Sequence, residues 1–146
     1  MLVEAVAAMA LLSVAGLVLF KGAINVLAPR QWTLVQNITD AYMTYEKAYA
    51  ERIEFDEAVG AGSPWPSYPS SSSTNVTLGT LPGGRTLTGE VIRTRMADSN
   101  NLSQHGGGGT TSTNPAELQS WKLQSHLLYR IGGREYVKSR TVVRTQ

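Results

Sequence analysis

The first thirty residues of the chain are almost continuously apolar. From Ala5 to Phe20 only Ser13 and Gly16 are not strongly apolar, and Lys21 ends the run. A membrane-spanning helix needs about 20 such residues, and the apolar residues on either side extend this run to the length of a tilted span. We therefore predict an apolar helix over residues 1–30 that is buried outside its own domain, in a bilayer or among copies of itself.

Helical patterning continues beyond this run, but the apolar residues now fall on one side. They recur at spacings of 3, 4, 3 and 4 at Val35, Ile38, Tyr42, Tyr45 and Tyr49. The opposite side is polar and carries Gln36, Asp40, Glu46, Lys47, Glu51 and Arg52. This pattern predicts an amphipathic helix over residues 31–58 whose apolar side, including the tyrosine rings, packs under the rest of the chain.

Two residues are expected to disturb the long helix. Pro29 removes a backbone hydrogen bond and clashes with the preceding turn, so we expect a kink or local melting there, and Gly22 adds flexibility. The pattern fades near Gly60, which is a natural helix stop. A helix from residue 1 to residue 58 would be roughly 87 Å long, which is more than a domain of this size requires.

The remaining residues, 59–146, have the character of loops and strands. Residues 61–75 contain three prolines and six serines, so we predict a loop that Trp65 and Tyr68 fix to the helix. Residues 97–114 are polar and rich in glycine, which predicts a surface loop.

Two pairs of glycines mark the turns of two predicted hairpins. Gly83-Gly84 precedes the alternating pattern of residues 85–96, and Gly132-Gly133 separates residues 121–131 from residues 134–143. Such turns join antiparallel strands. The chain is therefore predicted to have an α+β fold with one long N-terminal helix, and a small antiparallel sheet of three or four strands forms a head on residues 31–58.

The composition argues against an enzyme. The chain has no cysteine and two histidines, so thiolate chemistry is excluded and a histidine metal site would need carboxylate help. The run Gly106–Gly109 lacks the lysine and the following helix of a phosphate-binding loop, and the chain contains none of the common nucleotide, zinc-protease or serine-hydrolase motifs. We predict no catalytic residues, no metal and no cofactor.

The net charge of +2 conceals a separation of charge along the chain. Residues 40–57 carry six acids and two bases, whereas residues 121–146 carry six bases and one acid. These segments are expected to attract each other, within one subunit or between neighbours. Nucleic-acid binding is disfavoured because only Tyr129 and Tyr136 accompany the bases as stacking aromatics.

The single acid before the apolar run is the most informative residue. Glu4 precedes the run and no basic residue does, an order that fits neither a signal peptide nor a simple cytoplasmic-side anchor. A carboxylate in hydrocarbon is costly, so Glu4 needs a cationic partner such as an α-amino group. Alternatively, Glu4 lies at headgroup level near the helix N-terminus, where an acid is mildly favourable.

The segment MLVEAVAAMALLSVAGLVLF resembles the N-terminus of mature type IV pilins and pseudopilins, although one residue fewer than usual precedes the acid. The resemblance covers roughly the first 25 residues. It implies a long helix that melts near a proline on assembly, here near Gly22 and Pro29. It also implies that a prepilin peptidase removes a leader and methylates the new N-terminus, here Met1. Glu4 would then neutralise the N-terminal amine of a neighbouring subunit.

The expected function is that of a structural subunit of a helical filament of identical chains. The resemblance implies that the subunit waits in the bacterial inner membrane, that pilus assembly machinery polymerises it, and that the resulting fimbrium lies outside the cell. Adhesion, motility, DNA uptake and secretion all stay open as the role of such a filament. Two alternatives remain: a pseudopilin of a type II secretion system, and a single-pass membrane protein with a small periplasmic binding domain.

Overall fold

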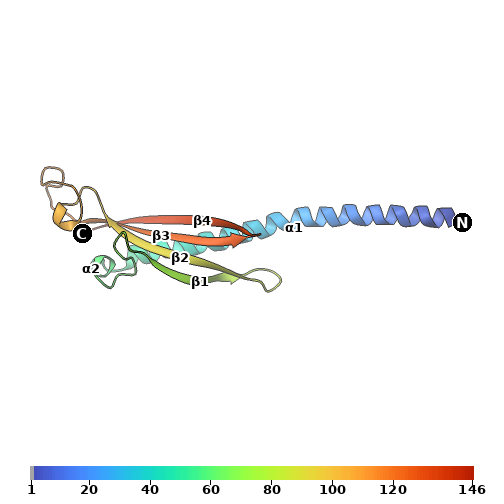
Figure 1. Cartoon of the computed structure of the whole chain (residues 1–146), viewed down its shortest axis with the longest axis horizontal. Coiled ribbons are helices and arrows are strands. Elements are labelled where there is room, and N and C mark those ends of the chain that lie inside the picture. The colour runs from blue at the N-terminus through green and yellow to red at the C-terminus, as the bar shows by residue number, and fades with distance from the viewer. Residues whose placement is uncertain (1) are drawn as a thin grey trace. The chain divides into compact units, whose positions relative to one another are not determined.

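The computed structural model describes residues 2–146, apart from the side chains of residues 2 and 26–28. Met1, the predicted methylated residue, lies outside this description. The elements are helices α1 (Leu2–Arg52) and α2 (Phe55–Val59), strands β1 (Ser72–Thr80) and β2 (Thr86–Ala97), a 3-10 turn at Ser103–His105, and strands β3 (Ser120–Ile131) and β4 (Arg134–Thr145). The strands form one antiparallel sheet in the order β1-β2-β3-β4 (Figure 1). The predicted α+β fold is confirmed.

The chain divides into two compact units, Met1–Gln36 and Asn37–Gln146. The boundary lies inside α1, a few residues beyond the predicted limit of the apolar helix at residue 30. Residues 37–52 of α1 and all four strands belong to the second unit. The second unit therefore combines the predicted segments 31–58 and 59–146, except that residues 31–36 belong to the first unit.

Helix α1 is more regular at its centre than predicted. It continues through Gly22 and Pro29 without interruption, so the melting expected at these residues is not seen in this subunit. The hydrogen bond lost at one proline is a small part of a helix of 51 residues, and Thr33 Oγ1 adds a hydrogen bond to the Pro29 carbonyl oxygen at 3.0 Å.

The end of α1 comes earlier than the predicted residue 58. The helix stops at Arg52, and Glu54 has extended backbone angles before α2 begins. Arg144 Nη1 donates to the carbonyl oxygens of Ala50, Glu51 and Ile53, each at 2.8 Å. The carbonyls of Ala50 and Glu51 belong to the group that a helix leaves unsatisfied at its end, so a side chain of β4 fixes the end of α1.

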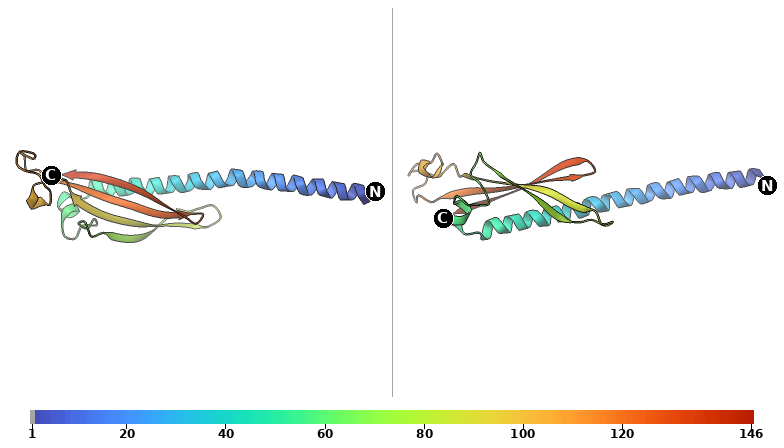
Figure 2. Two further views of the ribbon diagram at one scale, coloured as in Figure 1. Left: turned by 45° about the horizontal axis from the view of Figure 1, so that its top comes forward. Right: turned by 60° about the horizontal axis from the view of Figure 1, so that its bottom comes forward.

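The two glycine pairs form the predicted hairpin turns. Gly83 and Gly84 have φ of 89° and 77°, and Gly132 and Gly133 have φ of 55° and 82°. Only glycine adopts such angles without strain, and both turns lie at the same end of the sheet because the strands alternate in direction. In both views of Figure 2 the sheet runs alongside the C-terminal half of α1.

The core lies between this part of α1 and the sheet. Within the second unit the helix buries a row of four positions, Thr39, Met43, Glu46 and Ala50, and Ile53 directly after the helix is buried as well. Ile38, Tyr42 and Tyr49 from the predicted stripe are half-buried beside this row. Tyr45 is 60% exposed, so the prediction that it packs under the head is wrong. Tyr45 follows buried Met43 by two residues and precedes buried Glu46 by one, so the helical period turns its side chain away from the sheet.

The loop before β1 is held by one of its two predicted aromatic residues. Trp65 is fully buried, whereas Tyr68 is 67% exposed and does not pin the loop. The Trp65 ring centroid lies 5.3 Å from that of Tyr49, and its Nε1 donates to Ser125 Oγ at 3.1 Å. Trp65 therefore joins the helix, the loop and β3.

The glycine-rich loop is folded against itself. Asn101 is 1% exposed, and its side-chain amide pairs with both backbone groups of Ser120, at 2.6 and 2.8 Å. Gly108 N donates to Ser99 O at 3.0 Å and Gly109 N to Asn101 O at 2.8 Å. The predicted surface loop is thus a compact structure tied to the start of β3.

Gly107→Ala is expected to destabilise the second unit strongly, because a Cβ at this position would lie 2.0 Å from the Asn101 carbonyl oxygen. Relieving that overlap requires a backbone shift, which costs about 3 kcal/mol. The matched control is Gly108→Ala, whose Cβ would approach no other atom closer than 3.9 Å. Urea unfolding followed by tryptophan fluorescence measures both variants, and equal midpoints would contradict this packing.

Candidate functional site: an exposed apolar helix

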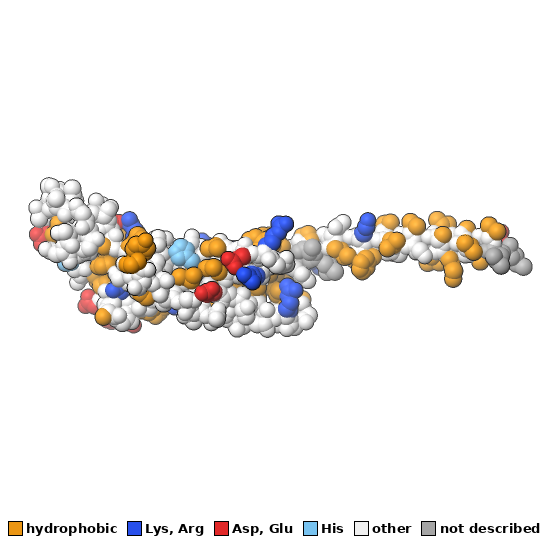
Figure 3. Space-filling model, in the orientation of Figure 1, with side chains coloured by type: hydrophobic (Ala, Val, Ile, Leu, Met, Phe, Trp, Pro, Cys, Tyr) orange, Lys and Arg blue, Asp and Glu red, His pale blue; other side chains and the backbone are white. Residues whose placement is uncertain are grey.

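The first compact unit carries large apolar side chains that nothing in the described chain covers. From Val3 to Ile24 their exposure ranges from 48% at Ile24 to 80% at Val3. The set comprises Val3, Val6, Met9, Leu11, Leu12, Val14, Leu17, Val18, Leu19, Phe20 and Ile24. Figure 3 shows orange side chains along the helix on the visible face. Because a helix turns every 3.6 residues, these positions surround its axis.

This surface requires an apolar environment on all sides. Burying one such side chain contributes about 1.5–3 kcal/mol, so the eleven together contribute on the order of 20 kcal/mol. A helix that is hydrophobic all round is a core helix or a membrane span. The helix is long and apolar enough to cross a membrane, with a mean hydropathy of 2.3 over 18 residues. A signal sequence near the N-terminus meets the same criteria of length and composition.

The few polar groups of this helix leave its surface apolar. Ser13 Oγ donates to the Met9 carbonyl oxygen at 2.8 Å, so its hydroxyl is satisfied within the helix. Glu4 is exposed in the first turn, where an acid is favourable beside the N-terminal end of the helix dipole. Since Met1 is not described, the predicted pairing of an N-terminal amine with Glu4 remains a prediction.

The second unit holds a buried ion pair that the sequence pattern placed on the solvent side. Glu46 is 0% exposed. Arg93 donates from Nε to Glu46 Oε2 at 2.8 Å and from Nη2 to Oε1 at 2.6 Å, and Ser125 Oγ donates to Oε2 at 3.2 Å. The hydrogen bonds with Glu46 raise the pKa of the Arg93 guanidinium. The prediction that Glu46 lies on the polar, solvent-facing side of the helix is therefore wrong.

A signal for this pair exists in the strands. Arg93 and Ser125 are register partners on β2 and β3. Each occupies an inward position within an alternation of buried apolar residues. Two polar residues at inward positions of predicted strands require a polar partner on the helix, and Glu46 supplies it.

Tyr42 Oη also donates to Glu46, to Oε1 at 3.1 Å. Burial raises the pKa of Tyr42 from 10.0 to about 12, and the Glu46 carboxylate adds to this effect. Because the pKa of Tyr42 is higher in the folded chain than in the unfolded chain, the protonated hydroxyl stabilises the folded chain. This stabilisation is complete below pH 10 and is lost as the pH rises toward 12.

An alkaline titration followed by phenolate absorbance is expected to show the ionisation of Tyr42 near pH 12 in the folded chain. Tyr42→Phe is expected to remove this late step and leave the rest of the titration unchanged. The signal is read immediately after a pH jump, before the chain unfolds. A late step that persists in the variant would show that another tyrosine carries it.

The separated charges pair inside one subunit. Lys138 Nζ lies 2.8 Å from Asp40 Oδ1, and Arg140 Nη2 lies 3.9 Å from the same oxygen. The acidic helix and the basic sheet therefore meet within the second unit. Of the two predicted arrangements, within one subunit or between neighbours, this is the first. Such partly exposed pairs contribute at most about 1 kcal/mol each.

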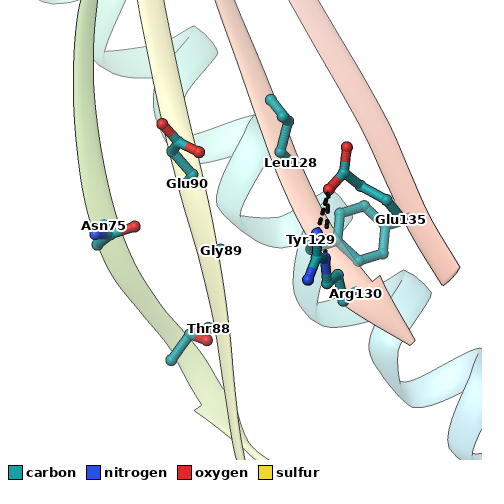
Figure 4. A pocket seen from close by; sticks show the side chains of 8 residues that line it. All are labelled: Asn75, Thr88, Gly89, Glu90, Leu128, Tyr129, Arg130 and Glu135. Carbon is teal, nitrogen blue, oxygen red and sulfur yellow. Dashed lines mark hydrogen bonds and ion pairs between the residues drawn. The ribbon is translucent and has the colours of Figure 1, made fainter. Parts of the chain in front are cut away.

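A shallow pocket of about 240 Å³ lies on the sheet and is lined by Asn75, Thr88, Gly89, Glu90, Leu128, Tyr129, Arg130 and Glu135 (Figure 4). Arg130 donates to Glu135 Oε2 at 3.2 and 3.3 Å, and Ser73 Oγ donates to Glu90 Oε1. Its charged groups therefore already have partners. In the part of the chain that the structure describes, no group of three or more His, Asp or Glu residues is placed to hold a metal ion.

Comparison with known proteins identifies no relative. No family model, no curated protein and no solved structure matches the chain. The layout itself, a long apolar N-terminal helix followed by a small antiparallel sheet, is compatible with that of a pilin.

Proposed function

We propose that the chain is a structural subunit of a helical filament of the type IV pilus kind, which polymerises through its apolar N-terminal helix. The observation that carries this proposal is the set of eleven large apolar side chains exposed around one helix whose first turn holds Glu4. A single lipid anchor accounts for the apolar surface. It also tolerates an acid at headgroup level, but only the filament gives that acid a specific partner, the amine of a neighbouring chain.

Polymerisation proceeds by transfer of the helix from one apolar environment to another. Before assembly the helix lies in the inner membrane. During assembly it enters a bundle of identical helices, so its apolar side chains stay out of water throughout. Identical contacts that do not close into a ring generate a helical filament, which extends outside the cell.

Glu4 sets the register of this bundle in the proposed mechanism. Its carboxylate pairs with the N-terminal amine of a neighbouring chain, at Met1 if the mature chain starts there. An unpaired charge among apolar helices is costly, and pairing removes that cost only at one axial offset between neighbours. The role is chemical recognition between subunits, and neither catalysis nor nucleic-acid binding forms part of it.

Electron microscopy of material sheared from the cell surface tests the proposal, together with the intact mass of the subunit. We expect thin filaments built from this chain, with the mass of one additional methyl group on its first residue. A monomer that stays in the membrane and forms no filament in cells or on overexpression supports the single-pass anchor instead. Short filaments confined to the periplasm support a secretion pseudopilin.

A further inference from the structure

A second pocket, of about 250 Å³, is lined by residues at the end of β2 and the start of β3. This end of the sheet lies opposite the two hairpin turns (Figure 1). The residues that define its chemistry are Ser67, Tyr68, Arg95 and Trp121. The backbone fixes one wall, because Tyr68 N donates to Arg95 O and Arg95 N donates to Pro66 O, both at 2.8 Å. The pocket is therefore part of the folded sheet.

Arg95 is the unusual group in this pocket. Its side chain belongs to a residue that is 8% exposed. Nη1 donates to the carbonyl oxygens of Ala58, Gly60 and Trp65, at 3.1, 2.9 and 3.0 Å. Nε is buried and has no hydrogen-bond partner, and it is the only such buried side-chain atom among the described residues. An unsatisfied buried donor of this kind is rare in folded proteins and is a reason to look for a ligand.

The unused edge of this guanidinium has a defined preference. Nε and the neighbouring Nη2 form a planar fork whose two N–H groups match the two oxygens of a carboxylate. The three carbonyl contacts through Nη1 hold the fork in place, so little rotational freedom is lost when a ligand binds. The group that fits this edge is a carboxylate.

Two aromatic rings supply the remaining surface. The Trp121 ring lies against Arg95, with the guanidinium carbon 5.6 Å from the ring centroid. The Tyr68 ring is 67% exposed, so it can turn over a ligand without loss of packing. Aromatic rings give flat apolar faces with polar edges. A flat or ring-shaped ligand body is the shape that such faces accept.

We propose that this pocket binds a carboxylate carried on a ring, with the acid on the fork of Arg95 and the ring against Trp121 and Tyr68. Uronic acids and aromatic acids share this chemistry. The pocket on the outer sheet face makes no similar demand, because its Arg130 is already paired with Glu135 (Figure 4). The proposal goes beyond filament formation and does not depend on it.

The test titrates the full chain in detergent micelles and follows the indole N–H resonance of Trp121. The probes are glucuronate and benzoate, with glucose and acetate as matched compounds that lack the acid or the ring. We expect saturable shifts with at least one ring acid, with a Kd of about 1 mM for a ligand of this size, and binding at least about tenfold weaker for glucose and acetate. The response to glucuronate against benzoate distinguishes a sugar acid from an aromatic acid.

Variants keep the test independent of folding. Arg95 also holds the loop at residues 58–65, so the main variant is Tyr68→Ala at an exposed position, which is expected to weaken binding about tenfold. Tyr45→Ala is the control, because Tyr45 has a similar exposure on α1 and lies outside the pocket. Arg95→Lys retains the charge and removes the fork, so the preference for the ring acid over its neutral counterpart is expected to fall.

Three results would overturn the proposal. They are the absence of a saturable shift with both ring acids, equal binding of the acids and glucose, and unchanged binding in Tyr68→Ala. Because the readout is the response of Trp121 to an added ligand, none of these results bears on whether the chain forms filaments.

Discussion

Replacing Glu4 by leucine is expected to leave the chain in the membrane and to abolish its filaments. The substitution lengthens the apolar surface, so membrane insertion is retained. In the bundle, however, the amine of the neighbouring subunit loses its partner, and an unpaired buried charge costs about 3–5 kcal/mol. Each added subunit incurs this cost again, so the equilibrium of every addition step shifts toward the free subunit in the membrane.

Filament yield in the sheared fraction measures this effect, with the amount of chain in the membrane fraction as the reference. Glu4→Gln is expected to behave like Glu4→Leu, because it removes the charge while keeping the size, whereas Glu4→Asp is expected to retain part of the yield. Glu54→Leu is the control, since it makes the same change at an exposed carboxylate outside α1. A normal yield from Glu4→Leu would disprove the proposed register mechanism.

Glu46→Leu is expected to produce the largest loss of stability in the second unit. It removes both hydrogen bonds from the Arg93 side chain, which is 18% exposed and is left without its counter-ion. Removing one member of a buried pair costs about 3–5 kcal/mol. Urea unfolding of the full chain in detergent, followed by tryptophan fluorescence, gives the free energy of unfolding.

Two further variants separate the ion pair from its surroundings. Glu51→Leu changes the same residue type on the same helix at an exposed pair with Lys47, 3.6 Å apart, and is expected to cost at most about 1 kcal/mol. The double variant Glu46→Leu/Arg93→Leu removes both charges and is expected to recover part of the loss. If the double variant were as unstable as the sum of the two single variants, the pair would not be the source of the stability.

The parts of the fold that follow from local chemistry were predictable. Gly132-Gly133 between two alternating segments determined a hairpin without any knowledge of the rest of the chain, and the apolar run before Lys21 determined a helix. These features depend on backbone geometry and on the period of apolar residues, both of which are visible within a few neighbouring positions.

The features that were missed depend on partners distant in the sequence. Glu46 looks like a solvated helix residue until Arg93 and Ser125 are brought opposite to it. The end of α1 at Arg52 depends on Arg144, more than ninety residues later. The unsatisfied donor of Arg95 likewise appears only when three carbonyls from the preceding loop have taken the other end of its guanidinium.

The surface of the proposed assembly site could be predicted from the sequence. The apolar positions from Val3 to Ile24 are exposed, as expected for residues whose partners are lipids or other subunits. Glu4 lies in the first turn of the helix, as its position requires. The proposed role of Glu4 is to pair with a neighbouring chain, so it is measured on the assembled filament.

Helix α1 belongs to both compact units, and this has a mechanical consequence. A pull on the apolar segment is transmitted along hydrogen-bonded backbone into residues 37–52, which the sheet holds from the side. There the load acts as shear on attachments made in parallel, by Arg93 at Glu46, by Lys138 at Asp40 and by Arg144 at the helix end. Attachments loaded side by side must fail together, whereas attachments peeled from one end fail in turn. The sheet is thus attached to residues 37–52 at three points that share a load applied along this part of the helix.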